Sequence, residues 1–170
     1  ALLPMDEASR MARAREMGFD VDQNWYHGTG EKFTAFDPDK QVDPGFWFTK
    51  NQMNAANYAD VDGDLINAYL KNPERPAVFG FDYDDQRLLF NGEPFDGDNV
   101  DAVRFAKSNG YDAAHFPEGN FSETDNTMVV FEPGNIRSKN AAFDPAKADS
   151  ADILSMGGSP IAAAPLVMGR

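Results

Sequence analysis

Cysteine is absent from this chain of 170 residues, and histidine occurs only twice, at His27 and His115. The absence of cysteine excludes disulfide bonds, thiolate nucleophiles and cysteine-based zinc sites. Two histidines that lie far apart in the sequence do not form a histidine-rich metal site by themselves. The sequence therefore predicts no metal site, and function must rest on other residue types.

Positive charge is also scarce, because 15 Lys and Arg residues face 28 Asp and Glu residues and the formal net charge is −13. This charge repels a phosphate backbone, so we do not expect a nucleic acid as a partner. A small phosphate-bearing ligand is not excluded, because a local arginine or backbone amides could hold it. The chain has no apolar run near the ~18 residues of a membrane span and no N-terminal leader peptide. We therefore expect a soluble protein with no membrane partner.

Apolar side chains are plentiful, at 42% of the residues, and 14 residues are phenylalanine. This composition and length predict one packed domain with flanking segments. Residue patterns predict helices at 5–17, 51–59 and 99–109, strands at 24–27, 46–49, 77–81, 112–116 and 128–131, and either type at 65–70. The expected organisation is a helical lead-in over 1–20, a domain over 21–145 and a flexible tail rich in Ala, Gly and Pro over 146–170.

The motif at residues 25–30 (Trp-Tyr-His-Gly-Thr-Gly) places His27 at the end of a short apolar strand, directly before a glycine-rich turn. Because Gly28 has no Cβ, a flat ligand is able to approach the backbone N–H and C=O groups there. The alternative is an ordinary strand end followed by a turn, with His27 as a structural histidine. For His115 and Arg137 the sequence favours a structural role.

Three segments resemble, in the right order, motifs of the ADP-ribosyltransferases related to diphtheria toxin and poly(ADP-ribose) polymerase. Residues 26–29 (Tyr-His-Gly-Thr) resemble the His-Gly motif of that family's first strand. Residues 45–49 (Gly-Phe-Trp-Phe-Thr), followed by 57–59 (Asn-Tyr-Ala), are similar to its Gly-x-Tyr-Phe-Ala and Ala-Asn-Tyr segment. Residues 126–132 (Asn-Thr-Met-Val-Val-Phe-Glu), followed by 135–137 (Asn-Ile-Arg), are similar to its late strand.

A closer resemblance is to the transferase domains of polyvalent proteins from phages and mobile elements. It rests on residues 26–29 together with 131–138 (Phe-Glu-Pro-Gly-Asn-Ile-Arg-Ser) and 141–145 (Ala-Ala-Phe-Asp-Pro), and it covers roughly residues 8–155. The resemblance implies an α+β fold in which a split pair of small antiparallel or mixed sheets, with flanking helices, clamps NAD⁺ as the substrate.

The resemblance also implies which residues bind NAD⁺. His27 would hydrogen-bond the ribose on the adenosine side, the Gly28 backbone would bind the nicotinamide amide, and Tyr58 would stack on the nicotinamide ring. Thr29 and Trp47 would complete the clamp. Trp47 stands where the family has its first tyrosine, but an indole still offers a face for stacking and one N–H donor. The alternative for Trp47 and Tyr58 is a place in the core.

Thr127 occupies the position of the family's catalytic glutamate. That glutamate hydrogen-bonds the ribose 2′-hydroxyl and stabilises a cationic transition state, whereas a threonine hydroxyl supplies no charge. A carboxylate could instead come from Glu123 or Asp125, in the loop just before the strand, or from the acceptor. We expect one of these sources, with His27 and Thr127 also in the catalytic site, rather than an inactive domain. The sequence leaves open whether Thr127 is the natural residue.

The implied function is transfer of ADP-ribose from NAD⁺ to a macromolecular acceptor, with release of nicotinamide. Because the chain is acidic, the expected acceptor is a bacterial protein rather than a nucleic acid. The protein would act as a monomer, carried in a virion or delivered into the cytoplasm of a bacterial host. Two alternatives stay open. One is NAD⁺ glycohydrolysis, with water as the acceptor, and the other is an inactive module that binds NAD⁺ or a partner.

Overall fold

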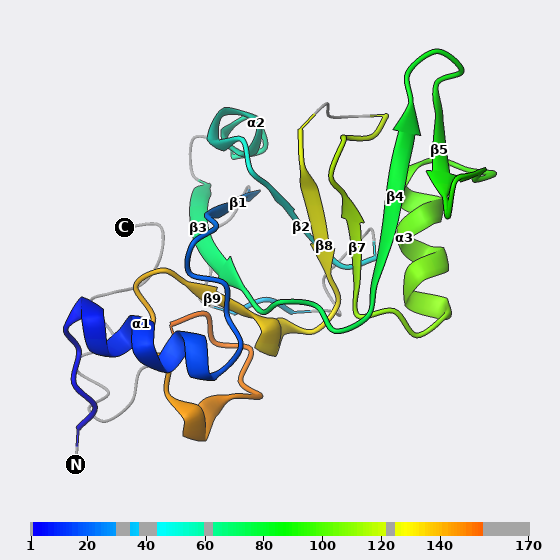
Figure 1. Cartoon of the computed structure of the whole chain (residues 1–170). Helices are drawn as coiled ribbons and strands as arrows, with labels where there is room; N and C mark the ends of the chain where they lie inside the picture. Colours follow the sequence, from blue (N-terminus) through cyan, green and yellow to red (C-terminus); the bar gives the residue numbers. More distant parts are fainter. Residues whose placement is uncertain (1, 30–34, 38–43, 60–62, 122–124, 155–170) are drawn as a thin grey trace.

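The computed structural model describes residues 2–29, 35–37, 44–59, 63–121 and 125–154. Within these ranges, a sheet of nine strands forms the centre of the molecule and three α-helices lie against it (Figure 1). The helices are α1 (Glu7–Glu16), α2 (Gln52–Ala56) and α3 (Asn99–Ser108). The strands are β1 (Trp25–Thr29), β2 (Phe46–Thr49), β3 (Asp64–Leu70), β4 (Pro76–Asp82), β5 (Arg87–Phe90), β6 (Glu93–Pro94), β7 (Ala113–Phe116), β8 (Thr127–Val130) and β9 (Ile136–Ser138).

The strands follow the order β6-β5-β4-β7-β8-β2-β1-β3-β9 across the sheet. Strands β4 and β7 run parallel, and the other neighbouring pairs of described strands run antiparallel. This mixed sheet with its helices confirms the α+β class. None of the helices in the described ranges is both long and apolar enough to cross a membrane.

The helices and strands predicted from the sequence are all present, although α2 ends at Ala56 and not near residue 59. The ambiguous segment at 65–70 lies in β3, where Ile66, Ala68 and Leu70 alternate into the core. The sequence did not predict β5, β6 or β9. Strands β6 and β9 have two and three residues, which is too short for a pattern of alternation to stand out, and the four residues of β5 (Arg-Leu-Leu-Phe) do not alternate.

The junction between β1 and β2 is the narrowest pairing in the sheet. Strand β1 pairs with β3 over all five of its residues, and β2 pairs with β8 over all four of its residues. Between β1 and β2, the register contains only the pair of Tyr26 and Thr49. The resemblance implied two separate small sheets, and this arrangement is not confirmed, because hydrogen bonds join the described strands into one sheet. The nearest feature to a division is this narrow junction.

The two faces of the sheet pack into different parts of the core. On β2, Phe46 and Phe48 belong to one apolar cluster, together with Met128 of β8. Trp47 lies on the opposite face and packs against a second cluster, to which Val129 also belongs. The α3 residues in this second cluster are Ala102, Val103 and Ala106. Alternation along β2 therefore decides which of its side chains face α3.

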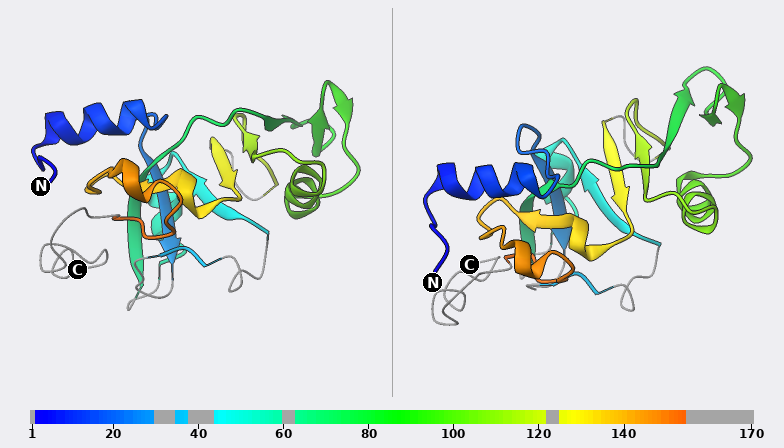
Figure 2. Two further views of the ribbon diagram at one scale, coloured as in Figure 1. Left: turned by 90° about the horizontal axis from the view of Figure 1, so that it is seen from below. Right: turned by 60° about the horizontal axis from the view of Figure 1, so that its bottom comes forward.

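Helix α1 and the segment after β9 pack against each other at the end of the molecule opposite α3 (Figure 2). Arg10 donates hydrogen bonds to the carbonyl oxygens of Lys139 and Ala141. Arg13 donates to the carbonyl oxygen of Ala142. The helical lead-in is therefore tied to the domain through backbone groups of the later segment.

The beginning of the expected flexible tail is packed. Ile153 and Leu154 are buried, and the carbonyl oxygen of Leu154 accepts a hydrogen bond from the Ala142 amide. Residues 146–154 thus belong to the packed structure, contrary to the boundary expected at 146, because these two apolar side chains find a place in the core. Residues 155–170 lie outside the described residues.

Helix α2 packs directly onto β1 at Gly28. A Cβ atom added to Gly28 would lie 1.8 Å from the carbonyl oxygen of Ala55 in α2. A backbone oxygen has little freedom to give way, so glycine is what permits the helix to approach the strand this closely. The sequence suggested that the missing Cβ makes room for a ligand. In the structure, the room on this side of Gly28 is taken by α2.

Arg137 is completely buried and holds the segment after β9 through backbone carbonyl groups. Its Nη1 donates to the carbonyl oxygen of Ile136 at 2.7 Å, and its Nη2 donates to that of Lys147 at 2.9 Å. Burial lowers the pKa of Arg137, and the nearby Asp152 carboxylate acts in the opposite direction. These contacts agree with the structural role that the sequence favoured.

We predict that Arg137→Met lowers the free energy of unfolding by about 3 kcal/mol, because buried carbonyl oxygens lose their donors. Urea denaturation at pH 7 measures this change. The control is Arg104→Met, because the Arg104 side chain is 61% exposed and lies 3.9 Å from Asp101. This control should change stability by less than about 0.5 kcal/mol. Equal urea midpoints for the two variants would contradict the role assigned to Arg137.

Candidate active site

A cavity of about 340 Å³ opens beside the narrow junction between β1 and β2. Its aromatic lining residues are Tyr26, Trp47, Phe48 and Tyr58. Its polar lining residues are His27, Thr49, Asn99, Asn120 and Thr127, and the remaining ones are Gly28, Ala55 and Val100. None of these described lining residues carries a carboxylate, an ammonium or a guanidinium group. The cavity wall is therefore built from rings and neutral polar groups.

The structure brings together most of the residues that the sequence assigned to the site. Those that line the cavity are His27, Gly28, Trp47, Tyr58 and Thr127. Thr29 is the last residue of β1 but is not among the described lining residues. Glu123 lies outside the described residues, so its place relative to the cavity stays a prediction.

His27 crosses the junction between β1 and β2. Its Nδ1 lies 2.7 Å from the carbonyl oxygen of Trp47, and its ring packs against Phe36 and Phe48 with centroid distances of 5.1 and 5.4 Å. Because a carbonyl oxygen only accepts, Nδ1 carries the proton and Nε2 is the acceptor nitrogen of the neutral ring. Burial lowers the pKa of His27, and the bond to Trp47 offsets this only in part. His27 is therefore neutral at pH 7 and links the two strands, while its contact with a ribose stays a prediction.

Trp47 and Tyr58 differ in how they meet the cavity. The Trp47 ring stacks on Phe116, with centroids 6.4 Å apart and planes 9° apart, and its Nε1 donates to the carbonyl oxygen of Pro44. Trp47 is thus part of the core as well as part of the wall. Tyr58 follows the end of α2 and is 60% exposed. This exposure excludes the core alternative for Tyr58 and leaves its ring at the opening of the cavity.

Thr127, at the start of β8, is 3% exposed, and its Oγ1 donates to the carbonyl oxygen of Asp125 at 3.2 Å. The Asp125 carboxylate itself accepts hydrogen bonds from Nδ2 of Asn51 at 3.0 Å and from Nδ2 of Asn54 at 2.5 Å. Asn51 is the N-cap of α2. Of the two carboxylates that the sequence offered near Thr127, Asp125 is therefore bound to α2 and does not line the cavity.

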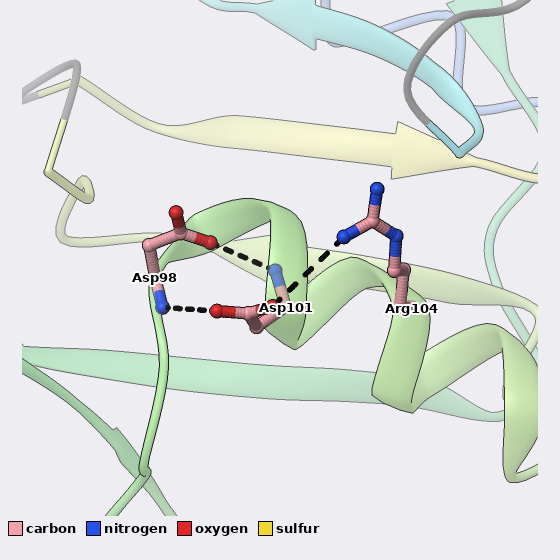
Figure 3. Close-up of polar contacts among 3 residues, drawn as sticks. All are labelled: Asp98, Asp101 and Arg104. Atoms are coloured by element: carbon pink, nitrogen blue, oxygen red, sulfur yellow. Dashed lines mark hydrogen bonds and ion pairs between the residues drawn. The ribbon is translucent and has the colours of Figure 1, made fainter.

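Asn99 and Asn120 form a polar wall that the sequence did not predict. Nδ2 of Asn99, the first residue of α3, lies 3.4 Å from Oδ1 of Asn120, which is only 4% exposed. A capping box between Asp98 and Asp101 fixes this end of α3 (Figure 3). The Asp-x-x-Asp pattern at 98–101 is a helix-start signal in the sequence. No local signal marks Asn120, because it lies 21 residues from Asn99 in the chain.

Burial lowers the pKa of both His27 and His115 below the ordinary value of 6.5. Below about pH 6.5 the unfolded chain therefore binds more protons than the folded chain. We predict that the contribution of the two neutral histidines to the free energy of unfolding is fully present above about pH 6.5. It is lost as the pH falls further, by up to about 1.4 kcal/mol per pH unit for each histidine. Urea denaturation at pH 7.5 and pH 5.5 measures the loss.

The matched variants for this prediction are His27→Asn and His115→Asn. An asparagine at position 27 keeps an amide donor for the Trp47 carbonyl but does not titrate. Each variant should lose less stability between the two pH values than the unchanged protein does. If His27→Asn loses as much stability between pH 7.5 and pH 5.5 as the unchanged protein does, the assignment of a neutral His27 with a lowered pKa is wrong.

The family described as "ADP-Ribosyltransferase in polyvalent proteins" matches residues 23–143, which include every described residue that lines the cavity. No curated protein matches the chain. A solved structure described as "Crystal structure of an anti-CRISPR protein" is similar at 13% identity, over 64% of this chain and 89% of that chain, with a TM-score of 0.38. The family match spans most of the chain and contains its His-Gly motif. The chain therefore belongs to the family of ADP-ribosyltransferases in polyvalent proteins.

Proposed function

We propose that the cavity binds NAD⁺ and that the domain transfers ADP-ribose from NAD⁺ to a macromolecular acceptor, with release of nicotinamide. The observation that carries this proposal is the meeting of His27, Gly28 and Tyr58 in one cavity, in a chain of an ADP-ribosyltransferase family. These residues lie on β1 and after α2, so only the fold puts them in one place.

The lining of the cavity suits the nicotinamide end of NAD⁺. That end is a flat, positively charged ring, and the face of an exposed tyrosine such as Tyr58 attracts such a ring. A volume of about 340 Å³ lies near the lower end of the range of small-molecule sites, which is about 300–1,000 Å³. The cavity therefore has room for one nucleoside half of NAD⁺. In this proposal the phosphates lie outside the cavity, whose described lining is neutral.

Transfer breaks the bond between C1′ of the ribose and the ring nitrogen of nicotinamide. The bonding electrons leave with nicotinamide and neutralise its ring, the acceptor's nucleophile bonds to C1′, and the acceptor's proton goes to a base or to water. Positive charge develops on the ribose during this step. Because Thr127 supplies a hydroxyl and no charge, the stabilising carboxylate comes in our proposal from Glu123 or from the acceptor itself.

A protein is the proposed acceptor. The net charge of −13 opposes the approach of a nucleic acid. In this proposal the domain acts inside a bacterial cell, after delivery by a virion or a mobile element. The domain is proposed to act there as a monomer.

A second candidate function is a catalytically inactive module that binds NAD⁺ or a partner in the same cavity. The observation in its favour is the absence of any carboxylate among the described residues that line the cavity. Without a negative charge near C1′, ligand binding survives more easily than bond cleavage. The two functions differ in turnover and share the binding step.

We predict that incubation with NAD⁺ labelled in its adenylate part and a bacterial lysate yields free nicotinamide and labelled protein. The Thr127→Glu variant restores a carboxylate at the family's catalytic position and should release nicotinamide about tenfold faster or more. Thr127→Val has the same size without a charge and should bring no gain. Nicotinamide release is followed by chromatography, and protein labelling by gel.

Each other outcome points to a different function. Release of nicotinamide without labelled protein would identify a glycohydrolase. Binding of NAD⁺ by calorimetry with no turnover in any of the three proteins would identify the binding module. The absence of both binding and turnover would overturn the proposal.

We further predict that Tyr58→Ala raises the Kd for NAD⁺ about tenfold, because the loss of one stacking contact is worth about 1–1.5 kcal/mol. Titration calorimetry measures the Kd. The control is Tyr83→Ala, because Tyr83 is also exposed, at 48%, but does not line the cavity. The idea that Tyr58 stacks on the ligand fails if both variants bind NAD⁺ as tightly as the unchanged protein.

A further inference from the structure

One wall of the cavity consists of two amide side chains, those of Asn99 and Asn120, which we call the amide wall. Both side chains line the cavity, and their Nδ2 and Oδ1 atoms lie 3.4 Å apart. Asn120 is 4% exposed, so what little of it is accessible faces the cavity. An asparagine amide offers one acceptor oxygen and two donor hydrogens, so an amide that lines a cavity can bind a ligand in addition to its neighbour.

The Asn99 side of the amide wall is held in a fixed position. The Asp98 carboxylate accepts from the Asp101 amide at 2.9 Å, and the Asp101 carboxylate accepts from the Asp98 amide at 3.0 Å (Figure 3). Arg104 lies 3.9 Å from the Asp101 carboxylate on the next turn of the helix. Because Asn99 lies between the two capping residues in the chain, the same contacts fix its backbone. Groups fixed in this way bind a ligand without first losing conformational freedom.

The register of the sheet shows how the two ends of the cavity differ. Tyr26 of β1 pairs with Thr49 of β2, and Thr49 pairs with Thr127 of β8, so these three residues form one row across the sheet. The row runs from Tyr26, on the strand that α2 contacts at Gly28, to Thr127. Strand β7, against which α3 packs, is the next strand beyond β8. Tyr26 and the end of α2, which Tyr58 follows, thus lie at the β1 end, and the amide wall lies at the β8 end.

We infer that the amide wall binds the hydroxyl groups of the ribose that carries the nicotinamide ring, and so selects a nucleoside over a free ring. This inference rests on the proposed function, because it assumes that the ring lies at the β1 end of the cavity. A sugar hydroxyl both donates and accepts, and an asparagine amide offers one acceptor oxygen and two donor hydrogens. Thr127 adds a hydroxyl at the same end.

A phosphate or a charged acceptor side chain fits this end of the cavity less well. The described lining has no cationic side chain to neutralise a phosphate and no carboxylate to bind a cation. The Asp98 and Asp101 carboxylates, on the residue before Asn99 and two residues after it, disfavour an anion nearby. A neutral, hydroxyl-rich group is therefore the ligand chemistry that this wall recognises best.

The test is titration calorimetry with three ligands, namely nicotinamide, nicotinamide riboside and NAD⁺. Asn120→Leu keeps the size of the side chain and removes its hydrogen bonds. It should raise the Kd for nicotinamide riboside and for NAD⁺ about tenfold or more, and leave the Kd for nicotinamide within about twofold. Asn109→Leu, at the opposite end of α3 and outside the cavity, is the matched control and should change none of the three.

A thermal melt verifies that each variant is folded. If Asn120→Leu does not fold, Asn99→Ala carries the test, because Asn99 is only half-buried and its backbone cap does not involve its own side chain. Asn99→Ala should also raise the Kd for nicotinamide riboside and for NAD⁺ but not for nicotinamide, by a smaller factor than Asn120→Leu. The inference is overturned if the variant raises the Kd for nicotinamide and for its riboside by the same factor, or if the Kd for the riboside does not change. If the unchanged protein binds none of the three ligands, the proposed function fails as well.

Discussion

Among the described residues, a hydrogen bond from the His27 side chain and one register pair join the two halves of the sheet where the cavity opens. His27 Nδ1 donates to the Trp47 carbonyl at 2.7 Å, next to the pair of Tyr26 and Thr49. Because β1 and β2 share no further register pair, the strands leave room beside the junction that side chains line but do not fill. The neutral state of His27 is part of this arrangement, because a second proton would put a charge beside Phe48. His27 thus both links the two strands and lines the cavity.

The cavity lining is neutral although the chain is strongly acidic. The carboxylates closest to the site in the sequence are used to position its walls. Asp125 accepts from Asn51 and Asn54 and so fixes the start of α2, while Asp98 and Asp101 fix the start of α3. The described lining therefore offers a ligand ring faces and neutral hydrogen-bonding groups. For the proposed transfer reaction, a charge that stabilises the transition state would have to come from a group beyond the described lining.

Local patterns in the sequence predicted most of the secondary structure. The aromatic segment at 46–49 and the Ala-, Met- and Arg-rich segment at 5–17 became β2 and α1, because propensity and alternation act over a few neighbouring residues. The same patterns did not predict β9, which has only three residues. They also misplaced the start of the tail, because small residues around Ile153 gave no sign that this side chain is buried.

By itself, the sequence determined which residue types stand at the motif positions. These include the His-Gly pair at 27–28, which together with the segments at 45–59 and 126–137 indicated the family, and the threonine at position 127, which left the source of a catalytic carboxylate open. Only the tertiary structure decided that Asn99 and Asn120 share a wall, that Asp125 binds α2, and that α2 takes the space beside Gly28. The physical reason is that each of these facts is a contact between residues far apart in the chain. Such contacts form when strands and helices pack, and no pattern confined to neighbouring residues encodes the distance between them.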